Sequence, residues 1–306
     1  MFSNLTDQKK GIYFAFITAF ISGISIFLNK FALDVVKPPL YFTSIKNFSV
    51  GILIACIILF SRELGSIKKL KKKELAYLFL IGVVGGSIPF YLYFTGLSQI
   101  PAINGAMIHK TLVVWVAVFA IPFLKEKLSK TQISGVLLLF ISNFMIGGFK
   151  GFEFSRGEMF VLAATILWAI ENVLAKKILA TVKVNIVVLF RMGLGSLILA
   201  AATFATLPNV VAKTFSLDIS QVFWITLTGA FLLGYVLTWY KALKYSSAIT
   251  VTSILVSSTL ITNFLSAIFI THTWETVITS QSLLIAGAVI LLLGTERKES
   301  HQMASN

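Results

Sequence analysis

The sequence contains little charge, few acidic residues and one cysteine. Charged residues make up only 12% of the 306 positions, and 12 Asp and Glu stand against 26 Lys and Arg. So few charged side chains cannot cover a water-exposed surface, which excludes an ordinary soluble domain. A single cysteine, Cys56, excludes an internal disulfide. The sequence also lacks metal-ligand spacings, phosphate-binding glycine loops and nucleophile triads, so we expect no catalytic residues, no metal and no cofactor.

Long apolar runs take the place of charge. Hydrophobic residues make up 57% of the chain, and one bilayer crossing needs about 20 of them in a row. Each crossing should be a helix, because a helix satisfies its own backbone hydrogen bonds in hydrocarbon. The sequence therefore predicts an all-α membrane protein with ten transmembrane helices. The predicted spans are 11–33, 40–61, 75–97, 102–124, 131–149, 157–178, 184–206, 221–243, 248–270 and 277–294.

Basic residues are distributed unevenly over the loops between these spans. Of the 26 Lys and Arg, 18 fall on the side of the N-terminus, four on the opposite side and four inside spans. Because cytoplasmic loops carry an excess of Lys and Arg, both termini are predicted to be cytoplasmic, in a multi-pass protein of the cytoplasmic (inner) membrane. The 18 residues are Lys9, Lys10, Arg62, Lys68, Lys69, Lys71, Lys72, Lys73, Lys125, Lys127, Lys130, Lys176, Lys177, Lys183, Lys241, Lys244, Arg297 and Lys298.

The densest basic run, at residues 68–73, has three interpretations. It could be a solvated loop that fixes the orientation, a nucleic-acid site or a regulated lipid switch. The solvated loop agrees with the uneven distribution of all the basic residues, so we expect no nucleic-acid partner.

The second half of the chain repeats features of the first. At an offset near 146 residues, the segment that starts at Gly11 aligns with the one that starts at Gly157, and Lys46 falls close to Arg191. The halves 11–149 and 157–294 would each contain five helices. Five is an odd number, so the halves would have opposite orientations in the membrane. Such an inverted repeat can open a shared central site first to one side and then to the other.

Several motifs resemble one family of membrane proteins. They include Leu28-Asn29-Lys30 at the end of the first span, the Gly82, Gly85, Gly86 and Pro89 series in the third, and Phe123-Leu124-Lys125-Glu126-Lys127-Leu128-Ser129 after the fourth. The last is similar to that family's Leu-Gly-Glu-Arg-Leu-Thr. Over about residues 10–295 the chain resembles the drug/metabolite transporter superfamily, and specifically its ten-helix EamA-type exporters.

Two positions depart from the family pattern. The family's Glu-Pro pair in the fourth helix is missing from His109-Lys110-Thr111-Leu112-Val113, and Ser257-Ser258-Thr259 occupies the comparable region of the ninth helix. The resemblance implies that each half is one EamA-like repeat and that the chain transports a small molecule, by export. It does not identify the substrate. Protons are a candidate coupling ion, and the protein could be a monomer or a homodimer. Membrane lipid is the other expected partner.

Ionisable groups inside a span are costly unless they are paired or face water, which makes each one a functional candidate. Lys30 and Lys46 lie near the outer ends of their spans and can extend toward the interface, so we assign them structural roles, with Lys46 also a candidate gating charge. Glu171 and Arg191 each lie ten residues from the turn near residue 181, at roughly 15 Å depth. They are predicted to form a structural or gating salt bridge, unless Glu171 titrates during transport or contacts a cationic substrate.

Lys110 is predicted to lie near the membrane midplane, roughly 12 Å from the outer surface. It could reach Glu171, bond to neighbouring carbonyl groups, or wait for an anionic group on the substrate. Lys30, Lys46, Lys110 and Arg191 outnumber Glu171 among the embedded groups, and this surplus favours a solute with a carboxylate or a phosphate, including zwitterionic solutes such as amino acids. His109 should point about 100° away from Lys110.

Polar and aromatic residues in the spans complete the predicted substrate site. Aromatic residues in helices are usually packing residues or interface anchors, but a mixed wall would suit an amphipathic solute. We therefore select Tyr91, Trp168, Asn172, Trp239 and Ser258 beside Lys110 and Glu171. Two other functions stay open: a proton-coupled exporter of amines or lipophilic cations that uses Glu171, and a non-transporting membrane scaffold.

Overall fold

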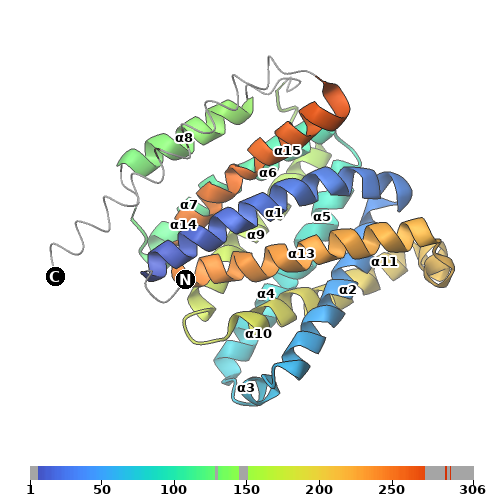
Figure 1. Ribbon diagram of the computed structural model, residues 1–306, viewed down its shortest axis with the longest axis horizontal. Coiled ribbons are helices and arrows are strands. Elements are labelled where there is room, and N and C mark those ends of the chain that lie inside the picture. The colour runs from blue at the N-terminus through green and yellow to red at the C-terminus, as the bar shows by residue number, and fades with distance from the viewer. Residues whose placement is uncertain (1–5, 128–129, 145–150, 273–286, 288–289, 291–306) are drawn as a thin grey trace.

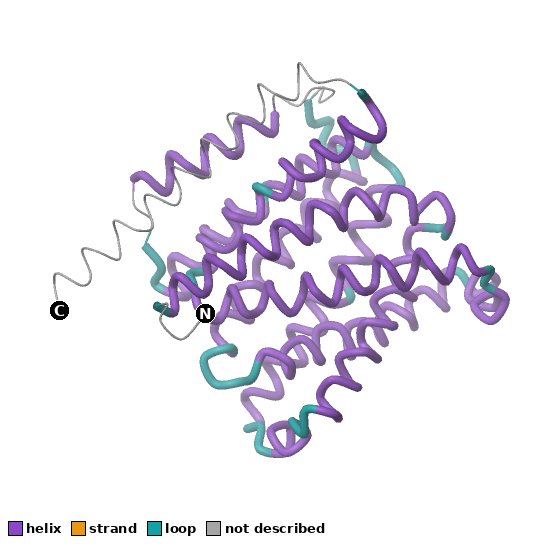
Figure 2. Tube along the Cα trace, viewed as in Figure 1, coloured by secondary structure: helices purple, strands orange, loops and turns teal. Residues whose placement is uncertain are grey.

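The computed structural model describes residues 6–127, 130–144, 151–272, 287 and 290. This part of the chain is a bundle of helices joined by short loops, and no strand occurs in it (Figure 2). Eight stretches of these residues are long and apolar enough to cross a membrane. They are Asp7–Val35, Pro39–Phe60, Lys72–Leu97, Asn104–Leu124, Arg156–Ile178, Val184–Thr206, Ile219–Tyr245 and Ala248–Ile270. The chain is therefore a multi-pass membrane protein, as the sequence predicted.

The eight stretches coincide with the first four predicted spans and with the sixth to the ninth. For the fifth, 131–149, helix α8 (Lys130–Phe144) covers the first part, and residues 145–149 lie outside the described residues. The tenth, 277–294, lies outside them except for positions 287 and 290. The total of ten spans therefore stays a prediction.

The described part of the chain contains α-helices in both halves and three short π or 3₁₀ helices in the second half. The first half contains α1 (Asp7–Val35), α2 (Pro39–Phe60), α3 (Leu64–Lys68), α4 (Lys72–Gly86), α5 (Ile88–Leu97), α6 (Ala102–Lys110), α7 (Leu112–Leu124) and α8. The second contains α9 (Arg156–Ile178), α10 (Val184–Leu189), the π-helix η1 (Phe190–Leu194), α11 (Gly195–Thr206), α12 (Pro208–Val211), the 3₁₀ helix η2 (Ala212–Ser216), α13 (Ile219–Tyr245), α14 (Ala248–Val256), α15 (Ser258–Ser266) and the π-helix η3 (Ala267–Thr271).

Helices of the two halves pack against one another in matched pairs. Helix α1 packs along α13, and α9 packs along α4 and α5 (Figure 1). Gly11 permits the close approach of α1 and α13, because a Cβ there would collide with Ser246. Gly157 permits the close approach of α9 and the segment after α5, because a Cβ there would lie 2.6 Å from Ile100. Gly157 follows Gly11 by 146 positions and Ser246 follows Ile100 by the same number, so small residues allow close approach at equivalent places in both halves.

Two spans are broken at equivalent positions. Thr111 separates α6 from α7, and Ser257, 146 residues later, separates α14 from α15. The Thr111 hydroxyl donates to the Ile108 carbonyl at 2.6 Å, and the Ser257 hydroxyl donates to the Ile254 carbonyl at 2.6 Å. Both backbone N–H groups bond to these same carbonyls at 3.0 Å, one residue short of the α-helical pattern. The same local structure therefore interrupts both spans.

The end of α7 meets the beginning of α14. Glu126, two residues after α7, accepts hydrogen bonds from the backbone N–H groups of Ala248 (2.7 Å) and Ile249 (3.1 Å). A carboxylate at a helix N-terminus is stabilised by the unpaired N–H groups and the helix dipole. The two broken spans pack against each other in this region and run in opposite directions along the bundle (Figure 1).

Candidate functional site

Glu171 is a carboxylate buried in the middle of the bundle. It lies on α9, with 1% of its surface exposed, and accepts a hydrogen bond at Oε1 from the Tyr240 hydroxyl of α13. The Nε atom of Arg191 lies 3.9 Å from the same oxygen. This contact is the pairing predicted from the equal depths of Glu171 and Arg191. Lys110, the other predicted partner, forms no ion pair with any described residue.

Arg191 is buried with much of its hydrogen-bonding capacity unused. It lies in η1, a π-helical turn of the kind often found at functional sites, and 7% of its surface is exposed. Its Nε has no hydrogen-bond partner, and one terminal nitrogen lies 3.7 Å from the Met192 sulfur, a weak acceptor. The guanidinium also lies 5.9 Å from the centre of the Tyr240 ring. A guanidinium has five N–H donors, so Arg191 can still bind an anionic group.

A break between α4 and α5 places Gly85 against Glu171. Pro89 has no backbone N–H and so cannot bond to the carbonyl four residues earlier, which is that of Gly85. The freed carbonyl accepts a hydrogen bond of 3.1 Å from the indole N–H of Trp168. A side chain at position 85 would collide with Glu171, so only glycine fits there without displacing that carboxylate. Gly85 thus joins Trp168 and Glu171, which lie three residues apart on α9.

A second tryptophan fixes the neighbouring amide. The indole N–H of Trp239 donates to Oδ1 of Asn172 at 3.1 Å, and both residues are nearly fully buried. The Trp239 ring is stacked parallel to that of Tyr235, with 6.0 Å between the centroids. Asn172 follows Glu171 on α9, and Trp239 precedes Tyr240 on α13. The predicted residues Glu171, Asn172 and Trp239 therefore lie along one contact between the two helices.

Three rings surround the other side of Trp168. Phe90 and Tyr93 of α5 lie 5.2 and 5.5 Å from its ring, and His109 of α6 lies 5.0 Å away. The Nδ1 atom of His109 is buried without a hydrogen-bond partner. His109 was not among the residues predicted for the substrate site. The structure instead places it in an aromatic cluster with Trp168, where its free ring nitrogen can bind a polar group of a solute.

Gly85, Trp168, Glu171, Asn172, Arg191, Trp239 and Tyr240 are called the Glu171 cluster below. The remaining predicted substrate residues form no described hydrogen bond or ion pair with this cluster. Lys110 is half-buried at the end of α6 and makes no hydrogen bond or ion pair with the described residues. Tyr91 is half-buried in α5 and likewise forms no side-chain hydrogen bond within the described part of the chain. Ser258, 6% exposed, is the first residue of α15, directly after the break at Ser257.

Lys46 is buried between α1 and α2. Only 8% of its surface is exposed, and its ammonium donates to Oδ1 of Asn29 at 3.0 Å and lies 4.5 Å from the centre of the Phe42 ring. The ammonium therefore has a polar partner on α1, a contact that the sequence did not predict. Lys30, in contrast, is exposed.

Two unpaired polar side chains on α2 gave no signal in the sequence. Thr43 and Asn47 are each 1% exposed, and the Thr43 hydroxyl and both amide atoms of Asn47 lack hydrogen-bond partners. The two residues lie one helical turn apart, so they face the same way. Buried polar groups are nearly always paired with protein or water, which makes this face a candidate wall of a polar cavity. In the described part of the chain, no three His, Cys, Asp or Glu residues lie close enough to hold a metal ion.

Known proteins match the chain along most of its length. The model of the EamA-like transporter family matches residues 9–148 and again residues 155–294, which confirms the resemblance indicated by the motifs. The uncharacterized transporter YyaM of Bacillus subtilis is 27% identical over 139 residues, or 43% of this chain and 45% of that protein. An S-adenosylmethionine/S-adenosylhomocysteine transporter of Chlamydia muridarum is 24% identical over 185 residues, or 58% of this chain and 57% of that protein.

Each of these alignments spans about half the length of the relative. A protein of known crystal structure has the same fold over nearly the whole chain. The TM-score is 0.79 at 15% sequence identity, and the match covers 95% of this chain and 99% of that one.

Proposed function

Since the chain belongs to the EamA-like transporter family, we propose that it is a secondary active transporter that exports a small organic metabolite across the cytoplasmic membrane by alternating access. The proposed solute carries a carboxylate, as amino acids do. The observation that carries this choice is that two cations within the spans have donor groups without a hydrogen-bond partner. Arg191 has a buried Nε without a partner, and Lys110 has no partner among the described residues. An anionic group on the solute would satisfy both.

The proposed architecture is an inverted repeat of two five-helix halves, 11–149 and 157–294. Three features support it: the matched breaks at Thr111 and Ser257, the matched contacts of Gly11 and Gly157, and the opposite directions of the two broken spans. Broken membrane helices leave backbone groups unpaired, which is tolerated where they are buried in protein or line a cavity. The solute site would then lie beside these breaks.

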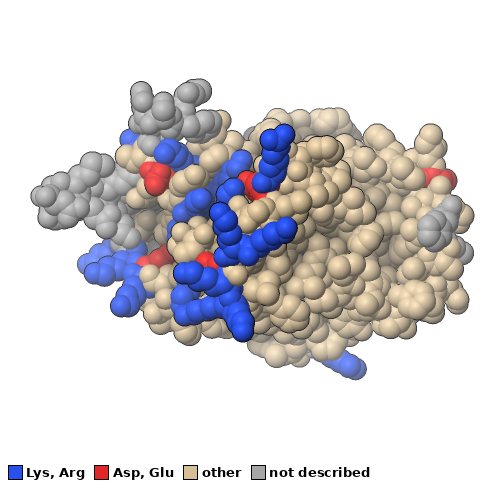
Figure 3. All heavy atoms as spheres, turned by 90° about the horizontal axis from the view of Figure 1, so that it is seen from below, with Lys and Arg blue, Asp and Glu red and all other residues tan. Residues whose placement is uncertain are grey.

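The proposed orientation places both termini in the cytoplasm. Its support is the concentration of Lys and Arg at one end of the molecule (Figure 3) and the excess of basic residues in the loops on that side.

Within this architecture we assign the solute's carboxylate to Arg191 and Lys110. Trp168, Asn172 and Trp239 would form the adjoining wall, with Tyr91 and Ser258 nearer the α5 and α15 segments. Glu171 would hold Arg191 in place between transport cycles. The transporter from Chlamydia muridarum handles solutes that are themselves methionine and homocysteine derivatives, which agrees with an amino-acid group as the recognised part.

Lys110→Met tests this assignment without disturbing a protein contact. The ammonium has no described partner to lose, so the variant should fold, but it should take up carboxylate-bearing solutes into proteoliposomes about tenfold less efficiently or worse. Lys30→Met removes an exposed lysine of the first span and serves as the matched control, with transport within about twofold of the parent. If Lys110→Met transports every carboxylate solute as well as Lys30→Met does, Lys110 does not bind the solute.

The proton-coupled export of amines or lipophilic cations is the alternative function. It requires Glu171 to exchange its partners for a proton and a cationic solute during each cycle. Tyr240 and Arg191 already engage this carboxylate, which disfavours the alternative. Under it, Glu171→Gln would abolish the coupling of transport to a pH gradient, whereas our proposal expects transport of carboxylates to retain its pH dependence in any variant that folds.

A further inference from the structure

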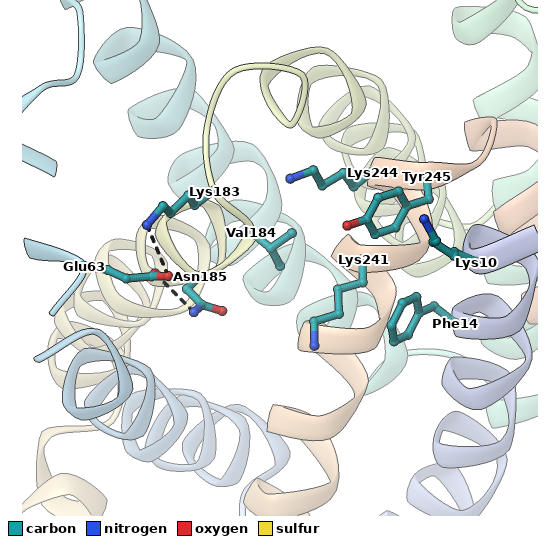
Figure 4. Close-up of a pocket in the computed structure, with 9 residues that line it drawn as sticks. All are labelled: Lys10, Phe14, Glu63, Lys183, Val184, Asn185, Lys241, Lys244 and Tyr245. Atoms are coloured by element: carbon teal, nitrogen blue, oxygen red, sulfur yellow. Dashed lines mark hydrogen bonds and ion pairs between the residues drawn. The ribbon is translucent and has the colours of Figure 1, made fainter. Parts of the chain in front are cut away.

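A polar cavity opens at the basic end of the molecule, and none of the residues that line it contacts Glu171. It has a volume of about 580 Å³ and lies between the start of α1, the segment around α10, the end of α13 and Glu63, which follows α2 (Figure 4). Four lysines contribute to its wall: Lys10, Lys183, Lys241 and Lys244. Cavities of this size accommodate small organic ligands.

Two of the four lysines are neutralised by carboxylates. Lys183 lies 3.5 Å from Glu63, whose other oxygen accepts a hydrogen bond of 3.2 Å from Asn185. Lys10 lies 3.0 Å from Asp7. Glu63 is therefore occupied by groups of the protein, so the one carboxylate in the cavity wall does not oppose an incoming anion.

The other two lysines are exposed, and they have no carboxylate partner among the described residues. Lys241 and Lys244 lie three residues apart on α13 and so share one face of the helix. Each contacts an aromatic ring only: Lys241 lies 5.4 Å from the centre of Phe14, and Lys244 lies 5.8 Å from the centre of Tyr245. Like charges at this spacing destabilise a helix slightly, and a bound anion would relieve that repulsion.

We propose that this cavity binds a phosphate group that is attached to an apolar moiety. The Lys241 and Lys244 side chains point in different directions from α13 (Figure 4), so both would turn toward the phosphate on binding. The apolar moiety would pack against Phe14 and Tyr245, which line the same cavity. Such a ligand can come from two sources, the headgroup region of an anionic phospholipid or a soluble phosphate ester. The proposal does not depend on which solute the protein transports.

The test compares binding by two double variants of the full chain. Lys241→Gln with Lys244→Gln removes the two unpaired ammonium groups from the cavity. Lys68→Gln with Lys69→Gln removes the same charge from exposed positions next to α3, in the same basic region but outside the cavity wall. One arm measures the unfolding temperature in nanodiscs of phosphatidylcholine with and without phosphatidylglycerol. The other titrates a soluble alkyl phosphate into protein in phosphatidylcholine nanodiscs.

The parent protein should be stabilised in at least one arm, because a ligand that binds the folded state raises its stability. In that arm the Lys241→Gln, Lys244→Gln variant should bind the phospholipid or alkyl phosphate about tenfold more weakly than the parent, or worse. The Lys68→Gln, Lys69→Gln variant should bind it within about twofold of the parent. Stabilisation only by phosphatidylglycerol identifies a lipid headgroup as the source, and stabilisation by the alkyl phosphate identifies a soluble ester. Equal responses of the two variants, or no response of the parent in either arm, would overturn the proposal.

Discussion

The Tyr240 hydroxyl is the direct hydrogen-bond donor to the buried Glu171 carboxylate. Tyr240→Phe removes this donor and leaves Glu171 with Arg191 at 3.9 Å as its remaining described partner. An unsatisfied buried acceptor costs about 1–3 kcal/mol, so the apparent unfolding temperature in detergent, measured without solute, should fall. Tyr91→Phe is the isosteric control, because the Tyr91 hydroxyl bonds to no described residue, and its effect should stay below about 0.5 kcal/mol. Equal shifts in the two variants would show that the hydroxyl of Tyr240 does not stabilise Glu171.

The sequence could predict part of this cluster from depth alone. Glu171 and Arg191 flank one turn at equal distances, so their pairing follows from helix geometry. Tyr240 and His109 were missed because they contact Glu171 and Trp168 on a helix far away in the sequence, and no local pattern reports such packing. Gly85 left a usable signal in Pro89, since a proline frees the carbonyl four residues earlier. The direction of a long side chain such as Lys46 depended on Asn29 of α1, which no single span reveals.

The junction between α13 and α14 is held by two charged side chains from other helices. The Lys176 ammonium of α9 donates to the carbonyl groups of Leu243 (2.7 Å) and Ser246 (2.7 Å) at the end of α13. Glu126 accepts from two N–H groups at the beginning of α14. Each charge has the sign that its helix end favours, so this junction is fixed by α7 and α9 together.

Glu126→Ala should loosen this junction. The variant leaves two backbone N–H groups of α14 without their acceptor, which lowers the free energy of unfolding by about 1–2 kcal/mol. Glu126→Gln keeps an acceptor but loses the charge and should fall between Glu126→Ala and the parent. Thermal unfolding in detergent provides the measurement, and Asp34→Asn, at an exposed position without described partners, controls for loss of a negative charge. A Glu126→Ala protein as stable as Asp34→Asn would contradict the role of Glu126 as a helix cap.

The sequence patterns did not predict the helix breaks at Thr111 and Ser257. The predicted spans 102–124 and 248–270 were each read as continuous, because a break of one residue leaves the mean hydropathy of a span unchanged. The structure interrupts them at Thr111 and Ser257. A hydroxyl that can bond to its own backbone competes with helical hydrogen bonds, and two such residues 146 positions apart were the available signal. The limits of the eight described spans were predictable to within a few residues, because long apolar runs define them.

At the scale of the whole molecule, helices of the two halves pack against each other across a shared interface. The first long helix of each half packs on the third-span helix of the other, α1 on α13 and α9 on α4 and α5. One apolar core includes residues from both halves, among them Ala15, Leu78, Met192 and Tyr240. Under the proposed alternating access, a movement of one half would displace helices that pack against the proposed site residues of the other half.

An inverted repeat requires the ends of the two broken spans to lie on opposite faces of the membrane. The first ends at Lys125 and the second at His272, two residues that share a left-handed backbone conformation, with φ of 54° and 51°. Lys125→Cys and His272→Cys, each in a Cys56→Ser background, are to be labelled with a membrane-impermeant maleimide. In intact cells only the cysteine at position 272 should react, and the cysteine at position 125 should react after permeabilisation. Reaction of both from the same side would mean that the halves are not opposed, and the proposed alternating-access mechanism would then lose its structural basis.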